Sequence, residues 1–547
     1  MSYQRGPHVL IALLVCSLLA LTVPIASPAT AAGDGTAAGS IIELYPNPTT
    51  EQNHGEYVIV EITEGENWTL TDGEGIARLP ADETGRFAAT RHPRLTATHT
   101  NATMVEASGR FRLAVTGETV TLRQDNTVVD TVSYEHAPES QQWHADREPR
   151  WQPTGFQPRS PTTVTDASVT AFVLPDNPAV PIDAIDDADE RLYLAAYTLT
   201  DQRVVDELIA AHDRGVDVVV LVEGGPVGGM TDRQAASLDE LTAAGVDTRV
   251  MTGDATRFRY QHAKYAVADD TAVVLTENWK PGGTGGADSR GWGVTTTSAS
   301  AADELAAIFE HDTTWEDTPS WKRVREEVDT VEAEAATGSY PQRHPPLSTS
   351  ADELTVLAAP DNAESELVGL INDTEEELLV VQPSIGDRDY RLLAAAIDAA
   401  DRGVEVRLLL SGSWYAEEEN TALAERLRER AADDNVPLSV RVADDNNRFG
   451  KIHAKGIVAD DTAVIGSLNW NDNSAENNRE VALAVTDRAV ADYYREVFAG
   501  DWQAGGDSGR VGILPSGETP AGLVVVAVGV ISGTALLAKR WLTFDPE

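Results

Sequence analysis

The sequence predicts an α/β protein made of two similar lobes related by a pseudo-twofold axis, preceded by an all-β sandwich. Three observations predict this fold: a long internal repeat, strand-like runs that alternate with helical segments inside each repeat, and short alternating runs before the first repeat. A chain of 547 residues is too long for a single core, so we expect about three domains.

The all-β region is expected over residues 38–150. It contains short alternating runs separated by Gly, Asn, Asp and Pro, namely IIELY, EYVIVEIT, WTLTD, FRLAV, VTLRQ and VVDTVSY. The succession IIELYPNP, GEYVIVEI and NWTLTDGEG resembles the lamin-tail family of immunoglobulin-like domains. This resemblance implies an accessory module that binds a surface partner and supplies no catalytic residue.

The two α/β lobes are expected over residues 166–330 and 351–503, with a linker over 331–350. Strand-like runs such as RLYLAAYTL and VDVVVLV alternate with helical segments, and HDRGVDVVVLVEG returns later as ADRGVEVRLLLSG. Repeats of this length are domains and not solenoid units. The segments 224–230 and 411–420 follow corresponding strands, so we expect them to form the two rims of a site.

One stretch of eighteen residues is written almost identically in both lobes. HAKYAVADDTAVVLTENW begins at His262 and HAKGIVADDTAVIGSLNW begins at His453, and twelve of the eighteen positions are identical. Residues i and i+2 of a strand point to the same face, so each histidine shares a face with Lys264 or Lys455. The following loop returns an asparagine, Asn278 or Asn469, to the same place.

Two His, two Lys and two Asn in one cavity suit displacement at phosphorus. One imidazole attacks and forms a phosphohistidine, while the other protonates the leaving oxygen. The lysines and amides hold the non-bridging oxygens as charge moves onto them. The lysine cations supply the charge that a metal would supply, so we expect no metal and no other cofactor.

Both copies match the HKD motif of the phospholipase D superfamily, and the second continues with the Gly466-Ser467-x-Asn469 of that family. The resemblance implies a bilobal fold with the site at the lobe interface. It also implies that His262 is the nucleophile and His453 the general acid. Asp269 and Asp460 would be structural and would pair with basic groups near the interface.

The first copy departs from the family pattern at two places. Leu275-Thr276 replaces Gly-Ser, although Thr keeps the hydroxyl. Glu480 resembles the acidic residue that orients a histidine in this family, and we expect it to support His453. Its counterpart in the first copy is Gly291, and Asp288 is the expected substitute. If Asp288 does not serve, His453 has the better-supported imidazole and the two histidines exchange roles.

Further residues are candidates for substrate contact. Arg257-Phe258 and Arg448-Phe449 precede the two histidines in register, as a phosphate clamp with an aromatic wall or as exposed strand ends. Trp279 and Trp470 are more typical of core supports than of ligand contacts. The expected substrate-binding residues are Thr276, Ser467, Arg257 and Arg448.

The composition is strongly acidic and poor in lysine. The net charge is −46, and only six of the 42 basic residues are lysines, which is typical of proteins that stay soluble in multimolar salt. A hydrophobic content of 42% argues against disorder. At molar salt the Debye length is about 3 Å, so this charge does not exclude an anionic substrate. It does argue against broad electrostatic attraction to nucleic acid.

Both ends of the chain carry apolar segments. Residues 1–32 read as a signal peptide, with Cys16 inside its apolar run. Residues 521–538 are uncharged, are followed by Lys539 and Arg540, and read as a membrane anchor behind a stalk over 504–520; a buried helix is the alternative. The sequence therefore predicts an exported enzyme held at the cell membrane by a C-terminal helix.

The predicted function is that of a cell-surface phosphodiesterase that hydrolyses or exchanges phospholipid headgroups. The alternative is an extracellular nuclease that cleaves DNA or RNA by the same mechanism. A third possibility is a surface binding protein without catalysis, which the intact His, Lys and Asn residues of both copies disfavour. The sequence does not indicate the oligomeric state.

Overall fold

The computed structural model describes residues 38–504 apart from short gaps at 49–50, 82, 98, 139–140, 148–149, 155, 157, 254–255, 316, 334–335, 387–389 and 444–446. The chain divides into two compact units, of which the first takes in Gly55–His136 and the second Ala137 onward. The expected signal peptide, the expected anchor over 521–538 and residues 505–520 of the expected stalk lie outside the described residues.

The first unit is all-β, as predicted. Its strands form two sheets, one with the order β1-β2-β5-β6 and the other β7-β4-β3-β8-β9. Side chains such as Leu70, Phe87 and Leu122 are fully buried between them. The elements are β1 (Gly39–Tyr45), β2 (Tyr57–Ile62), β3 (Trp68–Thr71), β4 (Gly75–Arg78), β5 (Gly85–Thr90), α1 (Pro93–Thr96), β6 (Thr103–Glu106), β7 (Ser108–Gly109), β8 (Glu118–Gln124) and β9 (Thr127–Tyr134). The short helix η1 (Glu51–Asn53) lies in the segment Tyr45–His54, which is assigned to the second unit.

The second unit contains the two predicted α/β lobes. A short antiparallel pair, β10 (Gln141–His144) and β11 (Trp151–Pro153), comes before them. The first lobe contains β12 (Thr162–Leu174), α2 (Val180–Asp183), β13 (Arg191–Ala196), α3 (Gln202–Arg214), β14 (Asp217–Glu223), α4 (Asp232–Ala244), β15 (Asp247–Met251), β16 (Tyr265–Ala268), β17 (Thr271–Leu275), β18 (Ser289–Thr296), α5 (Ala299–Thr313), α6 (Trp321–Val324) and η2 (Arg325–Glu327).

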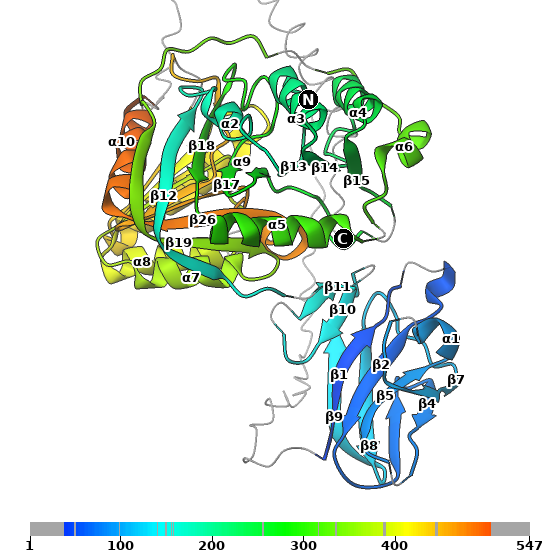
Figure 1. Cartoon of the computed structure of the whole chain (residues 1–547). Coiled ribbons are helices and arrows are strands. Elements are labelled where there is room, and N and C mark those ends of the chain that lie inside the picture. Colours follow the sequence, from blue (N-terminus) through cyan, green and yellow to red (C-terminus); the bar gives the residue numbers. More distant parts are fainter. Residues whose placement is uncertain are drawn as a thin grey trace, which may run out of the picture. The chain divides into compact units, whose positions relative to one another are not determined.

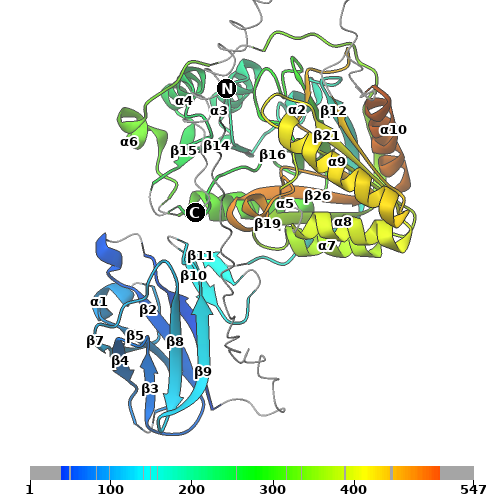
Figure 2. The same cartoon turned by 180° about the vertical axis from the view of Figure 1, so that it is seen from behind.

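The second lobe repeats this succession. Its elements are β19 (Leu347–Ala359), α7 (Ala363–Asp373), β20 (Glu377–Gln382), α8 (Arg391–Arg402), β21 (Glu405–Ser411), α9 (Glu417–Asp434), β22 (Leu438–Ala443), β23 (Lys451–Ile452), β24 (Gly456–Ala459), β25 (Thr462–Gly466), η3 (Asn473–Asn477), β26 (Glu480–Thr486) and α10 (Arg488–Ala504). Figure 2 shows α7, α8 and α9 on the second lobe.

One continuous sheet runs through both lobes. Its order is β15-β14-β13-β16-β17-β18-β12-β19-β26-β25-β24-β20-β21-β22, which reads alike from either end because each strand of one lobe has its counterpart in the other. The halves join at the long strands β12 and β19, which pair antiparallel from Thr162↔Val356 to Ala171↔Leu347 (Figure 1). This order is the pseudo-twofold relation that the repeat predicts.

The local sequence explains how the helices of each lobe end. Asp201 caps the N-terminus of α3 by accepting a hydrogen bond from the backbone N–H of Arg203. Gly215 ends α3 and Gly403 ends α8, both with a left-handed backbone (φ 96° and 100°) that glycine adopts without strain. The repeated Arg-Gly that follows each helix is therefore its stop signal.

No helix in the described part of the chain is long and apolar enough to cross a membrane.

Candidate active site

A hairpin carries each copy of the repeated motif. The segment His-Ala-Lys leads directly into β16 in the first lobe and into β24 in the second, and a tight turn then leads into β17 or β25. Asp269 and Asp460 occupy the turns with positive φ values of 49° and 47°. Each motif is therefore held at the centre of its half of the sheet.

The two aspartates are structural, but their partners differ from the expected basic groups. The Asp269 carboxylate accepts hydrogen bonds from the backbone N–H groups of residues 189–191 at 2.8–3.0 Å. Asp460 does the same with residues 375–377. Each carboxylate thus fixes the entry to the neighbouring strand, β13 or β20, and does not pair with a cation at the lobe interface.

Each histidine is anchored by the backbone of the other lobe. The N–H of His262 donates to the carbonyl of Arg479 at 3.0 Å, and the N–H of His453 donates to the carbonyl of Arg290 at 3.0 Å. These crossed bonds bring the two motifs to one place. The side chains of both histidines are mostly buried, with 12% and 20% exposed.

Glu480 orients His262 and not His453, which corrects the sequence-based expectation. Both carboxylate oxygens of Glu480 lie 2.9 Å from Nδ1 of His262. The same carboxylate accepts hydrogen bonds from Ser474 Oγ at 2.9 Å and Asn478 Nδ2 at 3.1 Å. The Glu480 side chain reaches the histidine of the other lobe because Arg479, the residue before it, forms a β-bridge with Gln261, the residue before His262.

These contacts determine the ionisation of the pair. Burial acts to raise the pKa of Glu480, but the charge and the hydrogen bond of His262 outweigh it, so this pKa lies below its usual value. Burial lowers the pKa of His262 to about 4 against the opposing effect of Glu480. At neutral pH, His262 is therefore a neutral imidazole with Nδ1–H on Glu480 and a free lone pair on Nε2.

His453 meets a different carboxylate, which the sequence analysis missed. Oε2 of Glu277 lies 3.2 Å from His453 Nδ1, and the Glu277 side chain is fully buried. The expected substitute, Asp288, instead pairs with Lys451 at 3.2 Å, so that expectation was wrong. One signal for Glu277 was available: the equivalent position of the second copy is Leu468, so a carboxylate had replaced an apolar residue inside an otherwise matching motif.

The two motif lysines are buried beside their own histidines. Lys264 donates to the carbonyl of His262, and Lys455 donates to the carbonyl of His453 at 2.6 Å. Burial is the main cause that lowers the pKa of Lys264, and it lowers that of Lys455 to about 8. The charge of each lysine acts on the histidine of the other copy, which confirms that the motifs converge.

The two asparagines follow the hairpins as predicted. Asn278 is 6% exposed, and in the described part of the chain its Oδ1 has no hydrogen-bond partner. Asn469 is partly exposed. Trp279 and Trp470 are fully buried behind them, and Trp279 donates to the carbonyl of Ala195. The tryptophans are therefore core supports of the loops.

The two motif hydroxyls serve the backbone, which corrects their assignment to substrate binding. Thr276 Oγ1 accepts from the N–H of Trp292 at 2.9 Å, and Ser467 Oγ accepts from the N–H of Val481 at 3.1 Å. Both residues are fully buried. Each hydroxyl joins the end of its hairpin to the next strand, β18 or β26.

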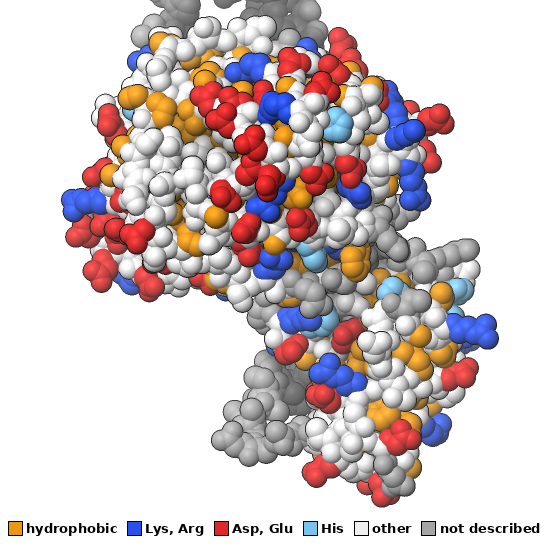
Figure 3. Space-filling model, viewed as in Figure 1, with side chains coloured by type: hydrophobic (Ala, Val, Ile, Leu, Met, Phe, Trp, Pro, Cys, Tyr) orange, Lys and Arg blue, Asp and Glu red, His pale blue; other side chains and the backbone are white. Residues whose placement is uncertain are grey.

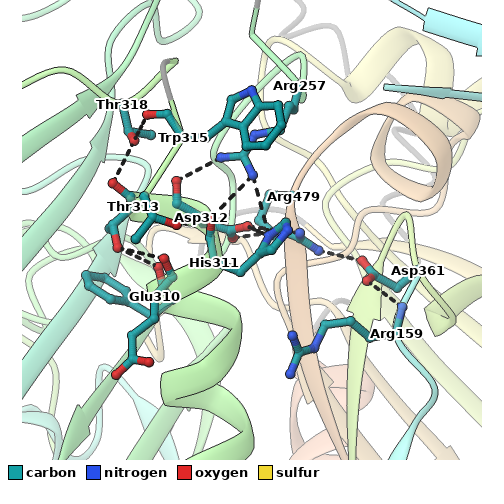
Figure 4. Close-up of polar contacts among 12 residues, drawn as sticks. Arg159, Arg257, Glu310, His311, Asp312, Thr313, Trp315, Thr318, Asp361 and Arg479 are labelled. Atoms are coloured by element: carbon teal, nitrogen blue, oxygen red, sulfur yellow. Dashed lines mark hydrogen bonds and ion pairs between the residues drawn. The ribbon is translucent and has the colours of Figure 1, made fainter. Parts of the chain in front are cut away.

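Arg257 is structural and not a phosphate clamp. Its guanidinium is 1% exposed and pairs with Asp317 at 3.0 Å. It also donates to the carbonyl of Asp312, next to the pair that Asp312 makes with Arg479 (Figure 4). In the second lobe, Arg448 pairs with Asp501 at 2.9 Å and is mostly buried, so its assignment to substrate binding is corrected too.

The pairs around these arginines form two related networks across the lobes. Arg479 of the second lobe pairs with Asp312 of α5 in the first, as well as with Asp361 (Figure 4). Arg290 of the first lobe pairs with Asp501 of α10 in the second. Because Arg479 and Arg290 also supply the carbonyls that hold the histidines, these buried pairs fix the distance between the two motifs.

The surroundings of His262 are aromatic. The ring of Tyr197 lies edge-on to the imidazole at 4.8 Å between centroids, and Lys264 Nζ lies 5.2 Å from the centre of the same ring. Tyr260 packs edge-on to Tyr197 at 6.0 Å. The hydroxyl of Tyr197 accepts a hydrogen bond from the N–H of Val227, so this side chain joins the rim over residues 224–230 to the imidazole.

The surroundings of His453 are cationic. The charges of Lys455, Lys280, Lys264 and Lys451 all act on His453, after burial, to lower its pKa well below the usual value. Four of the six lysines of this chain therefore gather at the site. Among the residues that the structure describes, no group of three or more His, Cys, Asp or Glu side chains is placed to hold a metal ion.

Comparison with known proteins agrees with this geometry. The sequence pattern of a family described as cardiolipin synthase, PLD-like domain, matches residues 182–313 and 367–502, one stretch in each lobe. The two lobes therefore belong to the phospholipase D superfamily, whose members include phosphodiesterases and enzymes that modify phospholipids. A search of curated protein sequences finds no significant match.

Three of the solved structures that resemble parts of this chain are the following, each with a TM-score below 0.5. Phosphatidylserine synthase of Haemophilus influenzae has 14% identity and a TM-score of 0.45, with 62% of this chain and 86% of that chain covered. Polyphosphate kinase of Porphyromonas gingivalis has 14% identity and a TM-score of 0.40, covering 61% and 47%. The phospholipase D family member Nuc of Salmonella typhimurium has 20% identity and a TM-score of 0.24, covering 29% and 98%.

Proposed function

We propose that this protein is a metal-independent phosphodiesterase that works through a phosphohistidine on His262. The observation that carries the proposal is the bidentate contact between Glu480 and His262 Nδ1, which leaves Nε2 as the nucleophile. Nε2 attacks phosphorus, the bond to the leaving oxygen breaks, and that oxygen takes a proton from His453. Water then attacks the phosphohistidine while His453 takes a proton from the water. The N–P bond breaks, and its electron pair returns to Nε2 of His262.

Charge in the transition state falls on the non-bridging oxygens of the phosphate. Lys264 and Lys455 lie beside the two histidines, and in their protonated forms they supply positive charge in a buried setting, where such charge acts most strongly. Asn278 follows the first motif in the chain, and its side-chain N–H₂ can donate hydrogen bonds to the same oxygens. These groups supply the stabilisation that a metal ion gives in other phosphodiesterases, which supports metal independence.

The substrate class that we propose is a phospholipid. Exposed apolar side chains lie on both rims: Val227 on the segment after β14 is 64% exposed, and Trp414 on the segment after β21 is 83% exposed. The first rim touches Tyr197 beside His262. The charges of Lys451 and Glu277 act on the pKa of Tyr415, so the second rim lies near His453. Apolar lips on both sides of a phosphate site suit a headgroup presented at a lipid surface.

A nuclease is the second candidate, and two observations favour it. Trp414 and Tyr415 are exposed neighbours that pack edge-on at 5.9 Å, and exposed aromatic rings can stack with the bases of a single strand. Lys280 and Lys451 add charge on the His453 side, where a second phosphate would lie. The net charge of −46 opposes long-range attraction of nucleic acid at low salt.

The location that we propose is the outer face of the cell membrane. The apolar segments at 1–32 and 521–538 support export and anchoring, and an anchor near a lipid surface agrees with a headgroup substrate. The β-sandwich would then be an exported accessory module with a surface partner, as its resemblance to lamin-tail domains implies.

The test uses the purified chain in molar salt with three substrates: phosphatidylcholine vesicles, phosphatidylglycerol vesicles and single-stranded DNA, each with and without EDTA. We expect release of headgroup from a vesicle substrate, undiminished by EDTA and absent in His262→Ala. Cleavage of DNA alone would support the nuclease instead. Loss of all turnover in EDTA that added metal restores would overturn the two-histidine mechanism.

A further inference from the structure

The two lobes differ at one position that their symmetry makes equivalent. Leu174 pairs with Gly291 between β12 and β18, and Ala359 pairs with Glu480 between β19 and β26. Gly291 therefore stands in the first lobe where Glu480 stands in the second. Glu480 reaches across to His262, so a side chain at position 291 would reach across to His453, but glycine has none.

The space that Gly291 leaves is filled by Glu277. A Cβ placed on Gly291 would lie 2.1 Å from Cγ of Glu277 and 2.8 Å from its Oε1, so the two side chains exclude each other. The position equivalent to Glu277 in the second lobe is Leu468, which is 5% exposed. The first lobe thus has Glu277 with Gly291, and the second lobe has Leu468 with Glu480 at the two equivalent positions.

The carboxyl of Glu277 lies beside the imidazole of His453. Oε2 lies 3.2 Å from Nδ1 of His453. In the described part of the chain neither oxygen of Glu277 makes a hydrogen bond, and neither does this nitrogen, because the angle at the contact is poor. A buried carboxyl without a partner is rare in a folded protein. Contacts of catalytic histidines are often poorly aligned without substrate and tighten when it binds.

We propose that Glu277 is the positioning residue of His453 and replaces, from the end of β17, the carboxylate that β18 lacks at position 291. Its carboxyl holds Nδ1 and so directs Nε2 of His453 at the leaving oxygen. This inference rests on the two-histidine mechanism proposed above.

The ionisation of the pair agrees with this role. Burial raises the pKa of Glu277 to about 7, and burial together with the nearby lysines lowers that of His453. Around pH 7 about half of these carboxyls hold a proton beside a neutral imidazole, and this protonated form is the one that passes on its proton. When Nε2–H gives its proton to the leaving oxygen, the Glu277 proton moves to Nδ1. The imidazole is then ready to accept a proton from water, and Nδ1–H returns its proton to the carboxylate.

The first test compares two phosphodiesters that differ in leaving group, p-nitrophenol and a simple alcohol. Glu277→Gln keeps the shape of the side chain but cannot pass on the proton. With the alcohol we expect the rate of phosphohistidine formation, measured in a single turnover, to fall by about 10²–10⁴-fold, the usual size of general acid catalysis, and with p-nitrophenol to change little. Equal losses on both substrates would overturn the inference, because a structural defect does not distinguish leaving groups.

A matched control exists in the β-sandwich. Glu56 is also buried, also has a pKa raised to about 7 by burial, and accepts a hydrogen bond from the backbone of Leu113. Glu56→Gln should leave turnover of both phosphodiesters unchanged. A loss with the alcohol equal to that of Glu277→Gln would show that removal of any buried carboxyl has this effect, and would overturn the inference.

The second test moves the carboxylate. Glu277→Leu alone should lose turnover with the alcohol. The double variant Glu277→Leu with Gly291→Glu copies the second lobe, where the same pair of residues already packs, and should regain a measurable part of that loss. No regain would contradict the assignment. In His453→Ala, adding Glu277→Gln should cost little more, whereas a full additional loss would show that Glu277 acts apart from His453.

Failure of this inference and failure of the proposed mechanism give different results. If the wild-type protein forms no phosphohistidine with either phosphodiester, the mechanism itself is wrong. If it does form one and Glu277→Gln turns over the alcohol substrate at the wild-type rate, only the role of Glu277 is wrong.

Discussion

The carboxylates beside the two histidines are the main difference between the halves of the site. Glu480 is ionised and accepts hydrogen bonds from Ser474 and Asn478 as well as from His262. Glu277 has no such partners, and burial raises its pKa to about 7. An ionised carboxylate supports a nucleophile, and a carboxyl that can hold a proton supports an acid. The two environments therefore support the proposal that His262 attacks and His453 transfers the proton.

Lys455 gives a prediction for the pH dependence. Burial lowers its pKa to about 8, so the ammonium loses its proton as the pH rises through that value. The positive charge is present below pH 8 and absent above it, so kcat/KM should fall with an alkaline limb near pH 8. A profile measured from pH 5 to 11 on a p-nitrophenyl phosphodiester checks this.

Lys455→Arg is the variant that separates this lysine from other groups. A guanidinium stays charged throughout the range, so the limb near pH 8 should disappear even if the maximal rate is lower. A wild-type rate that stays constant to pH 10 would show that the charge of Lys455 is not needed.

For single residues, the sequence predicts the catalytic side chains better than it predicts the residues that contact them. His262 and Lys264 stand two residues apart in the segment that leads into β16, so bringing them together requires only local geometry. Which histidine Glu480 contacts depends on how β26 packs against the other lobe, and the spacing of residues within one motif does not show this packing. Arg257 looked exposed because it is charged, but Asp317, sixty residues away in the chain, compensates its charge and allows it to be buried.

Between elements, the buried ion pairs hold the two lobes in register. Asp312 on α5 and Arg479 before β26 are both almost fully buried, and they are 2.8 Å apart. Removing Asp312 takes away one of the two buried carboxylates that compensate Arg479 and leaves Asp361 as its remaining partner. Because the carbonyl of Arg479 also anchors His262, this pair connects the stability of the interface to the site.

Asp312→Asn should therefore lower the free energy of unfolding by about 1–3 kcal/mol, the usual cost of weakening the hydrogen bonds of a buried charged group that keeps another partner. Urea unfolding in molar salt, followed by tryptophan fluorescence, measures it. The control is Asp401→Asn, whose pair with Arg430 lies at the surface and should contribute at most about 1 kcal/mol. Equal effects of the two substitutions would show that the buried pair has no special weight.

The elements themselves were largely predictable, and one boundary was not. Alternating apolar runs and Gly stop signals predict the strands and helices of each lobe, and the repeat predicts their pairing into similar halves. The expected linker over 331–350 overlaps β19, which begins at Leu347. Its first residues are polar and partly exposed, and they become a strand because they pair with β12. That pairing is a tertiary effect which the polar pattern alone does not show.

For the whole molecule, the acidic surface is the dominant physical feature. Acidic side chains are prominent on the face of the larger unit in Figure 3. A chain with a net charge of −46 repels itself unless salt screens the charges. We expect the protein to lose structure when molar salt is removed. Circular dichroism and thermal melting from 4 M to 0.1 M KCl check this, and an unchanged melting temperature would contradict adaptation to high salt.

The central claim is that His262 carries the phosphoryl group. The direct measurement is acid quench of the enzyme during turnover of a labelled p-nitrophenyl phosphodiester, followed by peptide mapping of the phosphohistidine. We predict label on His262 in the wild-type protein and in His453→Ala, since p-nitrophenolate leaves without a proton, and no label in His262→Ala. Label on His453 would reverse the assignment of the two histidines, and label on neither would contradict covalent catalysis.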